Sequence, residues 1–218
     1  MARALPQLGR RGTLLLATML IACAWSVTPT PAQAEDAGAE QVVQGLVEDI
    51  WITLRRNDVD DDRRVDDLRA LLEARTDVGL LSRLALGRYW QRLPEAQRQD
   101  YQELFRVVVL GSMARRLNTY AEDAATPLEE RFRIISSAPA GTHDVLVRSK
   151  VFPSNAQPLS LDWRLRAGDS GPVIIDLIIE GASLLVSQRS EFAAVIERYD
   201  LEGLLAELRA RAGATTRS

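Results

Sequence analysis

The chain has 218 residues, of which 46% are hydrophobic and 26% are charged, and its formal net charge is −3 at pH 7. This balance is typical of one globular domain of ordinary size. The net negative charge argues against nucleic acid as a partner, because binding a phosphate backbone needs an excess of basic side chains.

The first 34 residues have the pattern of a secretory signal peptide. Arginines precede an apolar run over residues 13–27, which is too short to span a membrane comfortably. Ala32 and Ala34 then give the small-x-small pattern that a signal peptidase accepts. We therefore expect a signal peptide over residues 1–34, cleavage near Ala34, and a single soluble periplasmic domain over residues 35–218.

Cys23, the only cysteine, provides an alternative to this expectation. It ends the segment "LIAC", which is similar to a lipoprotein processing box, so the mature protein would begin at Cys23 and be anchored by lipid. An apolar segment that stays uncleaved as a membrane anchor is a third possibility. If cleavage follows Ala34, the mature chain has no cysteine and therefore no disulfide or thiol chemistry.

Apolar residues recur every three or four positions in the first half of the expected mature chain, which predicts helices. The third of these is capped by Thr76 or Asp77, and Pro94 opens the fourth and longest. The expected helices cover residues 39–56, 57–75, 76–90 and 94–120.

A cluster of acids at the head of the second helix raises the question of calcium binding. Asp58, Asp60 and Asp62 have the spacing of the first EF-hand ligands. However, Arg63 occupies the glycine position of that motif and Arg69 its final acid position. The residues therefore predict a solvated helix start, since acids in a first turn favour helix formation.

The pattern changes to a period of two after Pro127, which predicts strands with one buried and one wet face. Turn-forming residues separate them, so neighbouring strands are expected to be antiparallel. Residues 188–211 return to a helical pattern. The fold class is therefore α+β, with N-terminal helices packed on a curved antiparallel sheet of about four strands, followed by C-terminal helices. The expected strands are 131–138, 143–152, 158–166 and 172–180.

Candidates for catalytic or metal chemistry are few. His143 is the only histidine and lies in a turn, while Ser183 in "EGASL" lacks the G-x-S-x-G elbow that exposes a nucleophile. Asp176, an acid inside an apolar strand, is expected to point from the outer face or to pair with an arginine. No zinc spacing, phosphate loop or dinucleotide glycine pattern is present. We expect no enzyme activity, metal or cofactor; a serine esterase using Ser183 is the enzymatic alternative.

Two long segments carry a resemblance to a known family. "LALGRYWQRLPEAQRQDYQELFRVVV", Leu84 to Val109, resembles the characteristic segment of the MlaC family, also called the toluene-tolerance phospholipid-binding family. "DLIIEGASLLVSQRSEFAAVI", Asp176 to Ile196, is similar to its C-terminal signature, in which Glu-Gly-x-Ser-Leu and then Arg-Ser-x-Phe follow an apolar strand. The strands "VRSKV" and "LDWRLR" also match, and the resemblance covers about residues 40 to 211.

The resemblance implies an NTF2-like, MlaC-type fold and a monomeric phospholipid-binding domain that holds acyl chains inside. It implies an auxiliary protein of an ABC transporter, which moves lipid in the periplasm between an outer-membrane lipoprotein complex and an inner-membrane ABC transporter complex. Such transport maintains outer-membrane lipid asymmetry, and the phospholipid is cargo rather than a cofactor. A hopanoid-associated relative has similar motifs, so the lipid class stays open. The other alternative is a non-catalytic NTF2-like adaptor domain with a filled core.

The cargo cavity is expected between the inward strand residues and the longest helix. Successive strand side chains alternate between faces, and only one parity is almost wholly apolar, so that parity must face the helices. Near the last strand, Gly181 permits a turn into the final helix, and Glu180 and Arg189 are expected to pair across it. The predicted lining residues are Phe105, Val108, Val147, Val151, Leu161, Trp163, Leu177 and Ile179.

Overall fold

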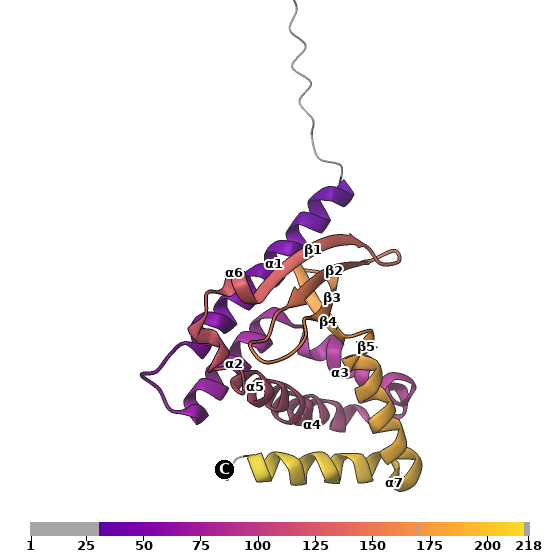
Figure 1. Ribbon diagram of the computed structural model, residues 1–218. Coiled ribbons are helices and arrows are strands. Elements are labelled where there is room, and N and C mark those ends of the chain that lie inside the picture. The colour runs from indigo at the N-terminus through magenta and orange to yellow at the C-terminus, as the bar shows by residue number, and fades with distance from the viewer. Residues whose placement is uncertain (1–30, 170, 216–218) are drawn as a thin grey trace, which may run out of the picture.

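The computed structural model describes residues 31–169 and 171–215. Within these ranges the chain forms helices, then an antiparallel sheet, then a long C-terminal helical segment (Figure 1). Most of the expected leader, including Cys23, lies outside the described residues, and Ala34 falls in the first helix. The helical elements before the sheet are α1 (Pro31–Leu54), α2 (Asp61–Arg75), α3 (Val78–Leu86), η1 (Gly87–Arg92), α4 (Glu95–Phe105), η2 (Arg106–Leu110), α5 (Gly111–Asn118), η3 (Asp123–Ala125) and α6 (Leu128–Arg131).

The sheet has the order β1-β2-β3-β4-β5, and each neighbouring pair is antiparallel. This confirms the expected α+β fold and the four long strands. The fifth strand was not expected; it exists because a two-residue turn at Glu180 and Gly181 folds the chain back on β4. The strands are β1 (Phe132–Pro139), β2 (Asp144–Val151), β3 (Leu159–Gly168), β4 (Gly171–Ile179) and β5 (Ala182–Ser183), and α7 (Leu184–Thr215) follows.

Two β-bulges interrupt the pairing of the sheet. Each leaves one residue without a direct partner, Ile135 in β1 and Ile175 in β4. A bulge bends its strand and increases the local twist, which accounts for curvature in a sheet of this size. Next to the second bulge, the consecutive residues Ile174, Ile175 and Asp176 are all buried.

The core consists of two clusters of buried apolar side chains. The first, called the sheet cluster, joins the sheet to α1, α2 and α5. The second, called the helix cluster, joins α3, η1, α4 and η2 to α7. The sheet cluster contains Ala39, Val43, Leu46, Val47, Ile50, Leu54, Leu68, Leu72, Ala114, Ala124, Phe132, Val147, Trp163, Leu165 and Ile174. The helix cluster contains Ala85, Leu86, Tyr89, Leu93, Tyr101, Leu104, Phe105, Val108, Phe192, Ile196, Leu204, Leu205 and Leu208.

The helix expected over residues 94–120 is divided into α4, the π-helical turn η2, and α5. Val108 of η2 belongs to the helix cluster, whereas Ala114 of α5 belongs to the sheet cluster. A π turn accommodates one extra residue and therefore rotates the apolar face of the helix that follows. One continuous helical stretch thus contributes to both clusters.

The C-terminal helical segment turns sharply at Asp200, whose φ of 60° is not helical. The side chain of Asp200 accepts a hydrogen bond from the backbone N–H of Gly203 at 3.1 Å and so starts the second half. Only glycine fits at position 203, because a Cβ there would lie 2.4 Å from the Cβ of Tyr199. The second half then runs back beneath α4 (Figure 1) and buries Leu204, Leu205 and Leu208.

Acidic side chains cap two of the early helices, and the sequence predicted the second of these caps. Asp60 accepts a hydrogen bond from the backbone N–H of Arg63 at 2.8 Å and caps α2. Asp77, rather than Thr76, caps α3 by accepting from the N–H of Leu80 at 2.8 Å. Both carboxylates also lie at the positive end of the helix dipole.

Candidate functional site

The inner face of the sheet, which packs on α1, carries the apolar residues that alternate along β2, β3 and β4. One row across the strands joins Val147, Trp163 and Leu177. Leu161 lies opposite Ile179 in the neighbouring row. All the predicted sheet residues share this face: Val147, Val151, Leu161, Trp163, Leu177 and Ile179.

Burial decreases along this face. Val147 is 0% exposed and Trp163 is 6% exposed, and both belong to the sheet cluster. Ile179 at the end of β4 is half-buried and belongs to neither cluster. The face is therefore filled at the middle of β2 and β3 and partly open toward the ends of β2 and β4. Of the predicted sheet residues, those that are half-buried and pack against the sheet cluster are Val151, Leu161 and Leu177.

Helix α5 contributes to the same cluster from the helical side. Ala114 is fully buried, while Met113 and Leu117 are half-buried and pack against the sheet cluster. Methionine is unbranched and adapts its shape to irregular apolar neighbours. Sequence reasoning did not include Met113 or Leu117 among the lining residues, although their i, i+4 spacing places them on one helix face. We call Val151, Leu161, Leu177, Met113 and Leu117 the half-open apolar layer.

The polar atoms on this face are paired with one another. The indole Nε1–H of Trp163 donates to Ser149 Oγ at 3.1 Å, and the Ser149 hydroxyl donates to the carbonyl oxygen of Leu161 at 2.5 Å. These bonds orient the Trp163 ring and leave neither side chain in need of water. The surface around them is suited to hydrocarbon contact.

The structure places the predicted helix residues Phe105 and Val108 in the helix cluster, not with the sheet residues. The Phe105 ring packs edge-on against Phe192 of α7, with 6.4 Å between the ring centroids. Tyr101 lies beside it and donates its hydroxyl to the carbonyl of Ser82 at 2.9 Å, and burial raises the pKa of this tyrosine. Helical periodicity identified a buried face, but not the element that covers it.

Ser183 and Asp176 hold the start of α7. Asp176 accepts hydrogen bonds from Ser183 Oγ at 2.5 Å and from the N–H of Leu185 at 3.0 Å. Ser183 Oγ in turn accepts from the N–H of Val186 at 3.0 Å, which is the geometry of an N-cap. Asp176 therefore binds a helix start rather than an arginine. His143 lies exposed in the β1–β2 turn and takes no part in these bonds.

The expected ion pair between Glu180 and Arg189 is wrong. Glu180 accepts a hydrogen bond from the backbone N–H of Ser160, whereas Arg189 donates its Nε–H to the carbonyl of Leu84 at 2.9 Å. Glu180 and Gly181 have φ values of 49° and 80°, so both occupy the left-handed region that a type I′ hairpin turn requires. This turn directs Glu180 back toward β3 and away from α7.

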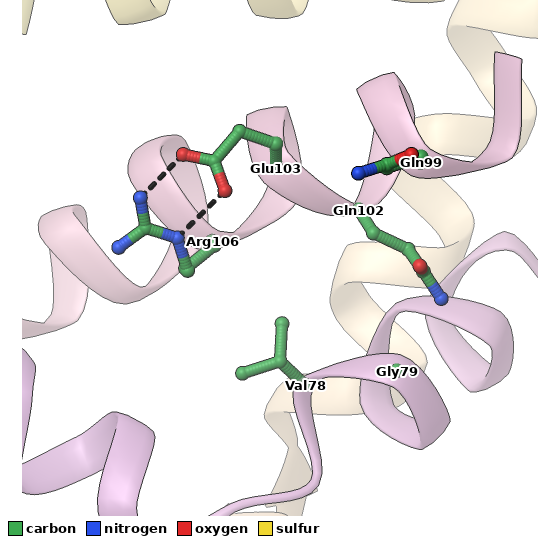
Figure 2. A pocket seen from close by; sticks show the side chains of 6 residues that line it. All are labelled: Val78, Gly79, Gln99, Gln102, Glu103 and Arg106. Carbon is green, nitrogen blue, oxygen red and sulfur yellow. Dashed lines mark hydrogen bonds and ion pairs between the residues drawn. The ribbon is translucent and has the colours of Figure 1, made fainter.

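A surface pocket of about 440 Å³ lies between α3 and α4, away from the inner face of the sheet. Figure 2 shows Gln99, Gln102 and Glu103 of α4 around it, with Val78 on the opposite side. Arg106 donates its Nε–H to Glu103 at 2.9 Å and Nη1–H to Glu73 at 3.0 Å, so its charge is paired within the protein. Four of the six lining residues, Gln99, Gln102, Glu103 and Arg106, nevertheless have polar side chains.

Neither a metal-binding group nor a membrane-spanning helix is found in the part of the chain that the structure describes. This part of the chain holds no group of three or more His, Cys, Asp or Glu side chains placed to bind a metal ion. Within residues 31–169 and 171–215, no helix combines the length and the apolar character needed to cross a bilayer.

The chain is similar to known proteins both by family and by three-dimensional structure. The family model described as "MlaC protein" matches residues 40–210. The chain is also similar to the solved structure of a phospholipid-binding protein from Ralstonia solanacearum in complex with a phospholipid. The two have 26% sequence identity and a TM-score of 0.65, and the match covers 83% of this chain and 99% of that chain.

Proposed function

Because this chain belongs to the MlaC family, we propose that it is a lipid carrier that binds a phospholipid through its half-open apolar layer. The observation that carries the proposal is the apolar inner face of the sheet, filled around Val147 and Trp163 but half-open at Leu161 and Leu177. The similar protein from Ralstonia solanacearum, which holds a phospholipid, supports the same assignment.

In this proposal residues 35–218 form one lipid-binding domain, and the acyl chains lie against the inner face of the sheet. The sheet residues Val147, Val151, Leu161, Trp163, Leu177 and Ile179 contact them from one side. Met113 and Leu117 contact them from α5. Phe105 and Val108 support this wall from behind, because they fix the preceding turns of the same helical stretch against α7.

Binding of this kind is reversible sequestration. Moving an acyl chain from water into an apolar site gains roughly 0.8 kcal/mol per CH₂ group, so two chains of lipid length are held very tightly against water. Release therefore requires a docked partner that offers the chains another apolar site. No covalent bond is made or broken, and the protein acts as a carrier rather than an enzyme.

Family membership supports a periplasmic location and two docking partners. We infer that the protein collects or delivers phospholipid at an outer-membrane lipoprotein complex and at an inner-membrane ABC transporter complex. A chain cleaved near Ala34 would diffuse between the two membranes. A chain anchored at Cys23 would instead transfer lipid while tethered to one of them.

Mass spectrometry of the purified protein tests the carrier function. Native spectra are expected to show a bound species of phospholipid mass, and an organic extract identifies its class. Extraction of a hopanoid would retain the carrier function and change the cargo. Repeated purification of lipid-free protein from cells that contain membranes would contradict the proposal and favour an adaptor domain with a filled core.

A further inference from the structure

A second surface pocket, of about 430 Å³, lies between η1 and the first half of α7. The sequence segments Leu84–Val109 and Asp176–Ile196, which carry the family resemblance, meet at this pocket. Its polar lining comes from Arg88 and Tyr89 on one side and from Arg189 and Ser190 on the other. None of these residues belongs to the sheet cluster or to the half-open apolar layer, so lipid sequestration does not account for them.

Arg189 is held in place by only part of its guanidinium group. Its Nε–H donates to the carbonyl oxygen of Leu84 at 2.9 Å. Its aliphatic stem fills the space beside Gly87, where a Cβ would lie 3.1 Å from Arg189 Cδ and where φ is +57°. Among the described residues, its two terminal nitrogens have no hydrogen-bond partner. The side chain is thus positioned by the backbone while its outer donors remain available for a ligand.

Two more arginines lie around Tyr89. The guanidinium carbons of Arg88 and Arg92 are 4.9 Å and 5.5 Å from the centroid of the Tyr89 ring. Arg88 also donates to the Tyr89 hydroxyl at 2.8 Å and to Glu197 at 2.9 Å. Of the carboxylates in residues 31–169 and 171–215, only Glu197 is bonded to Arg88, Arg92 or Arg189. These three arginines thus outnumber their bonded carboxylate, although the whole chain has a net charge of −3.

We propose that this pocket is a binding site for a phosphate group. Guanidinium groups present parallel N–H donors that match the oxygens of phosphate, and a pre-positioned arginine loses little freedom on binding. Arg189 supplies the free donors, while Arg88, which also lines the pocket, supplies positive charge that Glu197 partly offsets. The phosphate has two possible sources, a lipid head group at a membrane surface or free phosphate in solution.

Nuclear magnetic resonance and vesicle binding test this site. Inorganic phosphate is expected to shift the amide signals of Gly87, Tyr89 and Ser190 in ¹H–¹⁵N spectra of the protein. Sedimentation with phosphatidylglycerol vesicles, compared with phosphatidylcholine vesicles, tests the head-group source. Arg189→Gln should weaken the binding about tenfold, because it removes charge-assisted hydrogen bonds. Arg198→Gln is the matched control, since Arg198 lies on the same helix, stacks over Tyr199 at 5.4 Å, and is not part of the pocket.

The two assays distinguish a site for free phosphate from a site for lipid head groups. Localised shifts with inorganic phosphate that Arg189→Gln abolishes support a site for free phosphate. A loss confined to vesicle binding supports a site for head groups. Equal losses in Arg189→Gln and Arg198→Gln, or no loss in either assay, overturn the proposal.

Arg189→Gln also alters the contact with Leu84, so a second variant is needed. Arg88→Gln leaves that contact intact and must show the same loss, and an unchanged Arg88→Gln protein contradicts the proposal. The lipid that copurifies should be unchanged in all these variants. Failure of the phosphate site is therefore distinguishable from failure of the carrier function.

Discussion

Leu161 and Leu165 lie on the same face of β3 but differ in burial. Leu165 is 1% exposed within the sheet cluster, whereas Leu161 is half-buried in the half-open apolar layer. Leu161→Glu should therefore give a folded protein without lipid, because the carboxylate reaches water at the open side. Leu165→Glu buries an unpaired charge and should destabilise the fold by about 3 kcal/mol or more. Thermal unfolding by circular dichroism, together with mass spectrometry of extracted lipid, measures both effects.

The test depends on the difference in stability and in lipid content between the Leu161→Glu and Leu165→Glu proteins. A folded Leu161→Glu protein that keeps its usual lipid content would show that acyl chains do not contact this residue. Unfolding of both variants to the same extent would show that the core is packed equally at both positions, as in the adaptor alternative.

Asp144 links the stability of the sheet to pH. Its carboxylate accepts hydrogen bonds from Arg164 Nε at 2.7 Å and from Arg166 Nε at 2.6 Å. Burial alone would raise the pKa of Asp144, but the two arginines outweigh burial and hold the pKa below its ordinary value. The stabilisation is therefore complete above the unfolded-state pKa of about 3.9 and is lost as the pH falls through the lower folded-state pKa.

Denaturant unfolding at several pH values checks this expectation. The Asp144→Asn protein should be less stable than the unmodified protein at neutral pH, since two arginines lose their charged partner. The difference should shrink below about pH 4, because the unmodified protein then loses the contribution of the carboxylate. A constant difference down to the lowest pH would contradict the pKa assignment.

For single residues, the sequence predicted which side chains share a face of the sheet but not how deeply each side chain is buried. Alternation along β2 and β3 placed Val147, Leu161 and Trp163 together, because strand geometry has a fixed period of two. The burial gradient among them depends on where α1 packs on the sheet, and no local pattern encodes that. The bulge at Ile175 was equally hidden, because apolar residues occupy both parities before it, at Val173 and Ile174.

Turns and helices impose opposite demands on glycine, as Gly181 and Gly45 show. Gly181 has φ of +80° in the β4–β5 turn, where Gly181→Ala should cost about 1 kcal/mol. Gly45 lies inside α1, where a Cβ would make ordinary contact with Arg75 at 3.7 Å. Gly45→Ala should therefore stabilise the protein by about 0.5–1 kcal/mol. Chemical denaturation measures both values, and effects of the same sign would contradict the assigned conformations.

The expected positions of helices and strands agree with the structure better than the expected contacts between them. The alternating segments became β1 to β4 with small changes at their ends. The helix expected over residues 94–120 contains the π turn η2, which no residue pattern marks. Phe105 and Val108 were expected to face the sheet because they lie on an apolar helix face. That face meets α7 instead, because Phe105 packs against Phe192 and the chain returns after Asp200 to cover α4.

At the scale of the whole molecule, the two segments that carry the family resemblance are distant in sequence but adjacent in space. Tyr101 and Phe105 from the first pack against Phe192 from the second in the helix cluster. The resemblance therefore predicted the overall fold correctly, because it rests on both sides of one packed interface. It contained no information on which sheet residues remain half-open.

The expected signal peptide would determine whether the proposed carrier diffuses freely. Terminal sequencing of protein from the periplasmic fraction is expected to begin at Glu35, since Ala32 and Ala34 form the predicted cleavage pattern. A diacylglyceryl-modified Cys23 in the membrane fraction would contradict this expectation. In that case the protein would transfer lipid within the reach of its tether.

The division of the core into two clusters has a consequence for hydrogen exchange. A ligand stabilises the regions that it contacts, and local opening reactions of different parts of a fold have different free energies. Cargo bound at the half-open apolar layer should slow amide exchange in β3, β4 and α5, while exchange in α3 and the second half of α7 should stay the same. Deuterium uptake followed by mass spectrometry, before and after lipid removal, would measure this contrast. The π turn η2 would then mark the boundary between amides that respond to cargo and amides that do not.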